Sequence, residues 1–266
     1  RMRASRASSA RAPDMAALAA RHAVVTGGAR GIGRAIAARL TREGATVTVL
    51  GRNAEALERA VAEGAAHHAV PVDVTDETAV AQAFAALAAR APVDILVANA
   101  GAAESAPFGR SDAALFQRML DVNLFGAVHA AQAVLPGMTE RGFGRIVAIA
   151  STAAQKGYPY VSAYCAAKHA VVGLVRSLAQ ETARTGITVN AVCPGFTDTD
   201  IVGDSLERIV ATTGRDRDAA LASLVRHNPQ GRLVQPEEVA DAVAWLCGAS
   251  ATAITGQTIA VAGGEV

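Results

Sequence analysis

The stretch HAVVTGGARGIG, residues 22–33, decides the fold of this chain. It opens with a short run of apolar, strand-forming residues, continues as a glycine-rich turn, and leads into a pattern that places apolar side chains on one helical face as far as Leu40. A glycine-rich turn between a strand and a helix lets the backbone approach a pyrophosphate, while the helix amino end directs N–H groups at it. Gly27, Gly31 and Gly33 therefore predict a nucleotide site, rather than a plain tight turn.

The alternation of strand and helix continues along nearly the whole chain. It predicts an α/β fold with one domain, a doubly wound parallel seven-stranded sheet of the Rossmann type. We expect strands at 22–26, 46–50, 68–72, 94–98, 145–150, 188–193 and 258–261, and helices at 32–43, 54–63, 77–90, 112–138, 163–184 and 237–247.

Two segments depart from this rhythm. Residues 1–19 are predicted to be a flexible N-terminal extension, and residues 20–266 the domain; the Arg-, Ser- and Ala-rich start also has the composition of an organelle transit peptide. The segment at about 196–233 is long, charged and helical only in part. It follows a strand end, where open α/β sheets bind ligands, so we expect a substrate lid there.

Composition excludes several classes of function. A formal net charge of +1 gives no electrostatic reason to expect nucleic acid or a membrane surface as partner. Cys165, Cys193 and Cys247 lie in apolar stretches without metal-like spacing, so we expect no metal site and no disulfide. A cytoplasmic protein with a reducing environment fits these features.

Three residues form the predicted reaction centre. Tyr164 and Lys168 lie four positions apart, on one face of a predicted helix, and Ser151 follows a predicted strand. Among 25 basic residues only Lys156 and Lys168 are lysines, which indicates that Lys168 is needed as a lysine. Each residue alone would be a helix aromatic, a surface charge or a turn residue. Together, after a nucleotide turn, they predict a proton donor, a cation that makes the phenol acidic, and a hydrogen-bond donor to a carbonyl oxygen.

The end of the second predicted strand indicates which coenzyme is bound. An NAD site places an acidic residue there to receive the ribose hydroxyls, but this chain reads Leu50-Gly51-Arg52-Asn53. Arg52, with Arg30 from the glycine-rich turn, could instead hold a 2′-phosphate; the alternative is that both arginines are merely solvated. The pattern predicts NADP(H) in preference to NAD(H).

With these features together, the chain resembles the short-chain dehydrogenase/reductase family in its single-domain form. The likeness runs from about residue 20 to the end, and it is carried by TGGARGIG at 26–33, VANAG at 97–101, Asn123, Ser151, YCAAK at 164–168, Pro194-Gly195 and Thr199. The segment ARTGITVNAVCPGF, residues 183–196, is similar to bacterial 3-oxoacyl thioester reductases and to ketoreductases of aromatic polyketide synthesis.

The resemblance implies a place for each motif. Asn123 would anchor a water linked to Lys168, and the helices at 112–138 and 163–184 would pack four copies into a homotetramer. The coenzyme would be bound by Gly27, Arg30, Gly31, Ile32, Gly33, Arg52, Asp73, Val74, Asn99, Ala100, Gly101, Tyr164, Lys168, Pro194, Gly195, Thr197 and Thr199.

The function expected first is NADPH-dependent reduction of a 3-oxoacyl thioester, carried by coenzyme A or by a carrier protein. The alternative is NAD-dependent oxidation of a hydroxyacyl-CoA or a cyclic alcohol by the same residues. A different class of function is a non-catalytic regulator that binds a dinucleotide. Tyr158 and Tyr160 lack a lysine four residues on, so we expect them to line the substrate entrance.

Overall fold

The computed structural model describes residues 17–266, apart from the side chains at 201, 204, 209 and 213. Residues 1–16 of the predicted extension lie outside this range. Leu18 is buried, and its backbone N–H donates to the carbonyl oxygen of Glu43 at 3.0 Å, so the packed domain includes Leu18 and does not start at residue 20 as predicted. Over residues 17–266, no helix combines the length and the apolar character needed to cross a membrane.

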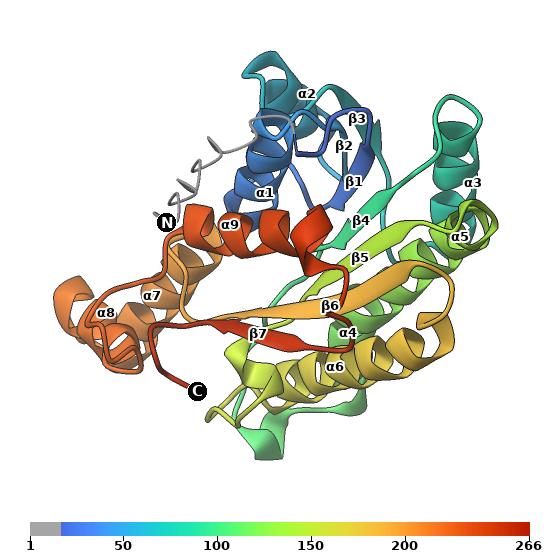
Figure 1. The fold of residues 1–266 in the computed structure, drawn as a ribbon. Helices are drawn as coiled ribbons and strands as arrows, with labels where there is room; N and C mark the ends of the chain where they lie inside the picture. Colours follow the sequence, from blue (N-terminus) through green and yellow to red (C-terminus); the bar gives the residue numbers. More distant parts are fainter. Residues whose placement is uncertain (1–16) are drawn as a thin grey trace, which may run out of the picture.

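Seven parallel strands form one sheet in the order β3-β2-β1-β4-β5-β6-β7, which confirms the predicted doubly wound fold (Figure 1). After β3 the chain returns to place β4 on the other side of β1, and such a reversal of strand order is where open α/β sheets bind ligands, at the carboxyl edge. The strands are β1 (His22–Thr26), β2 (Thr46–Gly51), β3 (His68–Pro71), β4 (Ile95–Ala98), β5 (Gly144–Ile149), β6 (Ile187–Pro194) and β7 (Thr258–Val261).

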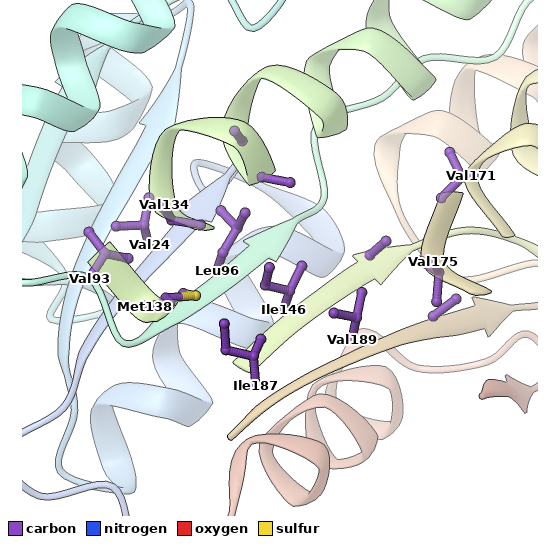
Figure 2. Close-up of a cluster of buried hydrophobic side chains, with 14 of the residues drawn as sticks. Val24, Val93, Leu96, Val134, Met138, Ile146, Val171, Val175, Ile187 and Val189 are labelled. Carbon is purple, nitrogen blue, oxygen red and sulfur yellow. The ribbon is translucent and has the colours of Figure 1, made fainter. Parts of the chain in front are cut away.

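Helices cover both faces of the sheet because successive strand residues point to opposite sides. Val24 and Leu96 pack against α3 (Glu77–Ala88), α5 (Gly126–Arg141) and α6 (Ser162–Thr182), in the cluster of Figure 2. Their neighbours Val25 and Val97 belong to the other face. There they pack with α1 (Gly31–Arg42), α2 (Ala54–Ala62) and α9 (Pro236–Cys247).

The prediction of one helix over 112–138 is wrong in its middle. The structure has α4 (Ala113–Leu120), a π-helical turn (Asp121–Phe125) and then α5. Inside the turn, the Asn123 side chain donates to the carbonyl oxygen of Met119 at 3.0 Å and so occupies a backbone acceptor of the preceding helix. A helical pattern of apolar residues cannot reveal one extra residue in a turn, which is why the sequence predicted a continuous helix.

The segment 196–233 forms a small helical unit of its own. It contains α7 (Asp200–Thr213) and α8 (Arg217–Val225). The two helices share an apolar cluster, which includes Val202, Leu206, Ala220 and Leu224. A bridge between Thr197 and Val234 ties the base of the unit to the chain that leads into α9.

Candidate active site

The glycine-rich turn after β1 is as tight as a pyrophosphate site requires. Gly27 has φ of 64° and Gly31 has φ of 52°, values in the left-handed region that favours glycine. Gly33 is required for space, because a Cβ there would lie 2.2 Å from the carbonyl oxygen of Gly27. The first turn of α1 has no acidic residue, and Arg30 at its N-cap makes no side-chain capping bond. The N–H groups of this turn are therefore suited to an anion.

A threonine that the sequence analysis did not single out holds the turn against β4. The Thr26 hydroxyl accepts from the backbone N–H groups of Asn99 and Ala100, both at 3.0 Å. The Asn99 amide donates in return to the carbonyl oxygens of Thr26 and Gly27, at 3.0 and 3.1 Å. A hydroxyl at the last residue of the first strand was the available signal, and only the strand order shows that it meets β4.

Gly101, Asn123 and Lys168 converge, although they lie on three different elements. A Cβ on Gly101 would lie 2.6 Å from Oδ1 of Asn123 and 3.5 Å from Nζ of Lys168. The Asn123 amide nitrogen also donates to the carbonyl oxygen of Ala102 at 2.9 Å, whereas its Oδ1 is buried and has no hydrogen-bond partner within residues 17–266. An amide oxygen held in this way is an acceptor still to be used, in the neighbourhood of the lysine.

Ser151, Tyr164 and Lys168 also come together at the carboxyl edge of the sheet. Ser151 follows β5; its hydroxyl oxygen accepts from the N–H of Ala153 at 3.1 Å, and Ser151 is near enough to the Tyr164 hydroxyl to lower the pKa of that phenol. Lys168 is only 4% exposed; its Nζ donates to the carbonyl oxygen of Ile149 at 2.8 Å and lies 5.8 Å from the centre of the Tyr164 ring. The three predicted reactive groups therefore share one corner, in which Lys168 is buried and Ser151 and Tyr164 are partly buried.

The predicted acidic phenol is not what the structure shows. Burial raises the pKa of Tyr164 above its usual value, and the nearby Ser151 only partly opposes this. Burial also lowers the pKa of Lys168 to about 8. The physical reason is that both groups lose hydration, which disfavours the charged form of each. At neutral pH the phenol is therefore protonated, as a proton donor must be.

The residues predicted to hold the nicotinamide end of the coenzyme, at 194–199, lie at the end of β6 and in the chain that follows it. Gly195 donates its N–H to the carbonyl oxygen of Val261 at 3.0 Å, and the Thr197 hydroxyl donates to the carbonyl oxygen of Gly195 at 3.0 Å. Thr199, directly before α7, places its Cγ2 3.3 Å from the Cβ position of Gly31. The first turn of the 196–233 segment therefore touches the glycine-rich turn. Pro194 is the last residue of β6.

The predicted adenine-end residues lie beyond the ends of β2 and β3. Asp73 accepts from the N–H and the hydroxyl of Thr75, at 3.0 and 2.8 Å, and these bonds hold the pKa of its carboxyl below the usual value; the charge of Arg52 acts in the same direction. Arg30 forms an exposed ion pair with Asp200 at 3.5 Å. No local pattern indicates that pair, because the two residues are 170 positions apart.

The two other tyrosines differ in position. Tyr160 is 66% exposed and has φ of 67°, whereas Tyr158 is turned toward the carboxylate of Glu265. Val74 is buried, and Ile32, in the first turn of α1, packs against the core. In the described part of the chain, no three His, Cys, Asp or Glu side chains are grouped to hold a metal ion.

Comparison with known proteins agrees with this geometry. Residues 21–209 match the model of the short chain dehydrogenase family. A Streptomyces coelicolor protein provisionally named a ketoacyl reductase is 40% identical over 91% of this chain and 95% of its own length. Cis-4-hydroxycyclohexanecarboxylate dehydrogenase of Sinomonas cyclohexanicum is also 40% identical, over 93% of this chain and 97% of its own.

A solved structure extends the likeness to three dimensions. A variant of actinorhodin polyketide ketoreductase, crystallised with NADPH, superposes with a TM-score of 0.88 at 39% identity and covers 92% of this chain and 97% of its own. The fold, the converging residues and these relatives lead to one conclusion: this chain is an NAD(P)-dependent oxidoreductase and belongs to the short chain dehydrogenase family.

Proposed function

We propose that this protein uses NADPH to reduce a ketone, and that its first substrate class is a 3-oxoacyl thioester on coenzyme A or a carrier protein. The observation that carries the proposal is the corner in which the buried Lys168 lies 5.8 Å from the ring of Tyr164, while Ser151 lies near enough to that phenol to lower its pKa. Burying an amine and a phenol side by side costs stability, so such a pair is typical of a functional site.

The residues present fit a dinucleotide. The turn lacks the Cβ atoms that would fill it, the first turn of α1 offers N–H groups to a pyrophosphate, and Asn123 keeps a buried acceptor in the neighbourhood of Lys168. When bound, the coenzyme supplies the hydride. The coenzyme-binding set that we propose is the one the resemblance implies, with Thr26 added as the residue that holds the turn in place.

The chain's own residues supply the proton. Tyr164, protonated at neutral pH, would donate its phenolic proton to the carbonyl oxygen as negative charge develops there. Ser151 would donate a hydrogen bond to the same oxygen. The Lys168 ammonium would stabilise the phenolate left on Tyr164, and Asn123 would hold that ammonium through its free Oδ1, directly or through a water.

The Tyr164→Phe variant separates an enzyme from a dinucleotide-binding regulator. We expect it to lose about 10²- to 10⁴-fold in kcat for ketone reduction because the proton donor is gone, while NADPH binding persists. Loss of turnover with retained binding, measured by NADPH oxidation and by NADPH fluorescence, supports the enzyme. Full activity in this variant would contradict the mechanism.

The preference for NADPH rests on Arg52 and Arg30. No carboxylate stands at the end of β2, and Arg52 already lies close enough to Asp73 to influence its pKa. The exposed pair between Arg30 and Asp200 is weak, so Arg30 can turn to a phosphate at little cost. Arg52→Ala should raise the KM for NADPH about 10- to 100-fold and leave the KM for NADH unchanged. Arg59→Ala, on the exposed face of α2, is the matched control; equal effects on both coenzymes would contradict the assignment.

The relatives favour a second candidate function as well. One relative's name describes oxidation of a cyclic hydroxy acid, at the same identity as the ketoacyl reductase. NADPH-dependent reduction of acetoacetyl-CoA, compared with NAD-dependent oxidation of a hydroxycyclohexane, distinguishes the two. A larger kcat/KM in the second assay would indicate that the substrate is a cyclic alcohol and not a thioester. The proposed roles of Tyr164 and Lys168 would stay the same.

We also propose a homotetramer in a reducing, cytoplasmic compartment. Phe125, at the start of α5, exposes 41% of its surface, which supports contact with another copy through α5 and α6. All three cysteines are buried free thiols, as a reducing compartment allows. Sedimentation equilibrium tests the assembly, and a monomer at micromolar concentration would contradict it.

A further inference from the structure

A buried carboxylate lies beside the proposed active site without belonging to the family set described above. The side chain of Glu265 is 1% exposed, and its Oε1 accepts from the Tyr158 hydroxyl at 2.5 Å and pairs with Nζ of Lys156 at 3.0 Å. Nδ1 of His227 lies 4.0 Å from the same oxygen. We call Lys156, Tyr158, His227 and Glu265 the Glu265 cluster. It joins three segments: the chain after β5, the end of α8 and the chain after β7.

The cluster touches two loops that carry proposed site residues. The Tyr158 hydroxyl also shares a 2.7 Å hydrogen bond with Thr152, the residue directly after Ser151. On the other side, Oε2 of Glu265 would lie 3.1 Å from a Cβ on Gly195, in the chain that follows β6. Glu265 thus lies between the loop that follows Ser151 and the proposed nicotinamide loop, at the carboxyl edge of the sheet.

Aromatic rings cover the Glu265 cluster on the side of the 196–233 segment. Tyr158 meets Phe196 and His227 edge-on, at ring-centre distances of 5.9 and 5.8 Å, while Phe196 and His227 stack at 5.7 Å. These rings limit access of water to the carboxylate. An ion pair in such a place is screened less than one at the surface, so its charges act strongly on anything bound nearby.

The charge balance of the cluster depends on Glu265. Lys156 is 35% exposed, five positions after Ser151, and without a partner it would present a free cation to the substrate side. Glu265 cancels that charge. The carboxylate can only accept, so Tyr158 must donate to it; burial and this hydrogen bond both raise the pKa of Tyr158, which therefore stays neutral. Oε2 has no hydrogen-bond partner in the described range, so all hydrogen bonding of the carboxylate passes through Oε1.

We infer that Glu265 is a specificity-determining residue, which neutralises Lys156 so that the site accepts ketones with an uncharged acyl group and rejects free 3-oxo acids. The inference rests on the proposed reductase function and narrows its substrate class. A thioester or ester carries no charge at the carbon where a free acid carries a carboxylate. A free Lys156 ammonium would attract that carboxylate, whereas the Lys156–Glu265 pair gives it no net attraction.

The test compares two ketones that differ only at this group, acetoacetate and ethyl acetoacetate, with NADPH. In Glu265→Gln, the amide oxygen still accepts from Tyr158 but the negative charge is gone. We expect the ratio of kcat/KM for acetoacetate over ethyl acetoacetate to rise about tenfold. The double variant Glu265→Gln with Lys156→Met should return the ratio toward the wild-type value. Lys156→Met alone leaves an unpaired anion and should lower the ratio.

The outcomes separate this inference from the proposed function. An unchanged ratio in Glu265→Gln, with activity on the ester, would overturn the inference and leave the reductase intact. If the wild type reduces neither ketone and also fails to reduce acetoacetyl-CoA, the proposed function fails. Calorimetric titration of acetoacetate into the NADPH complex then still decides: the inference requires tighter binding to Glu265→Gln than to the wild type, and equal or weaker binding refutes it. Thermal unfolding of each variant verifies that it is folded.

Discussion

Lys168→Met should make the protein more stable while it removes the activity. Burial lowers the pKa of Lys168 from 10.5 to about 8, and each tenfold change in proton affinity is worth ~1.4 kcal/mol. Keeping this ammonium charged inside the fold therefore costs about 3 kcal/mol below pH 8. Methionine fills a similar volume without a charge. The variant loses the hydrogen bond to the carbonyl oxygen of Ile149, at a cost of roughly 1 kcal/mol, which leaves a net gain of about 2 kcal/mol.

The gain has a defined dependence on pH. Below pH 8 the folded and unfolded wild-type chains both hold the Lys168 proton, so the full cost of its burial is present. Between pH 8 and 10.5 the unfolded chain binds more of this proton than the folded chain, so the free energy of unfolding of the wild type rises with pH. The stability difference between variant and wild type should therefore shrink as pH rises through this window.

Thermal unfolding of the coenzyme-free protein at pH 7 and pH 9.5, at one protein concentration, measures the effect. At pH 7 we expect the Tm of Lys168→Met to lie about 4–8 °C above that of the wild type. Lys156→Met is the matched control; because it strands the buried Glu265 carboxylate, it should lower the Tm at both pH values. The reasoning is refuted if Lys168→Met is less stable than the wild type at pH 7, or if the difference is the same at both pH values.

Three further predictions concern the turn, the sheet and a helix cap. Gly33→Ala should lower the free energy of unfolding by about 1–3 kcal/mol and abolish NADPH binding, because its Cβ would strike the carbonyl oxygen of Gly27. In the control Gly109→Ala the new Cβ meets open space, so neither property should change. Denaturant unfolding and NADPH fluorescence measure the two properties. Burial lowers the pKa of His22, so the unfolded chain takes up the His22 proton before the folded chain does, and the free energy of unfolding should fall as pH drops below 6.5. In denaturant titrations, His22→Gln should show a shallower fall of this free energy with pH. An equal fall in variant and wild type would contradict the prediction. Asp76→Ala removes the N-cap acceptor of α3 and should lower the free energy of unfolding by about 1 kcal/mol in the same titrations. An unchanged denaturation midpoint would contradict this.

Much of the fold and of the proposed site could be predicted from local sequence. The strand at His22–Thr26 ends at Thr26 as predicted, because a run of apolar residues and then Gly27 is a strong local signal. The four-residue spacing of Tyr164 and Lys168 fixes their common face for any helix, whatever packs around it. By contrast, the π-helical turn around Asn123 could not be predicted, since it depends on where that side chain finds backbone acceptors.

The sequence by itself determined that this chain forms a parallel α/β domain with a glycine turn, and which residue types do its chemistry, because these follow from periodicity and from spacing along one helix. Only the tertiary structure decided which distant residues meet: Gly101 with Lys168, Arg30 with Asp200, and Lys156 with Glu265. It also decided the pKa directions. The sequence predicted a phenol made acidic by its lysine, but burial disfavours the charged form of both groups, and burial exists only once the chain has folded.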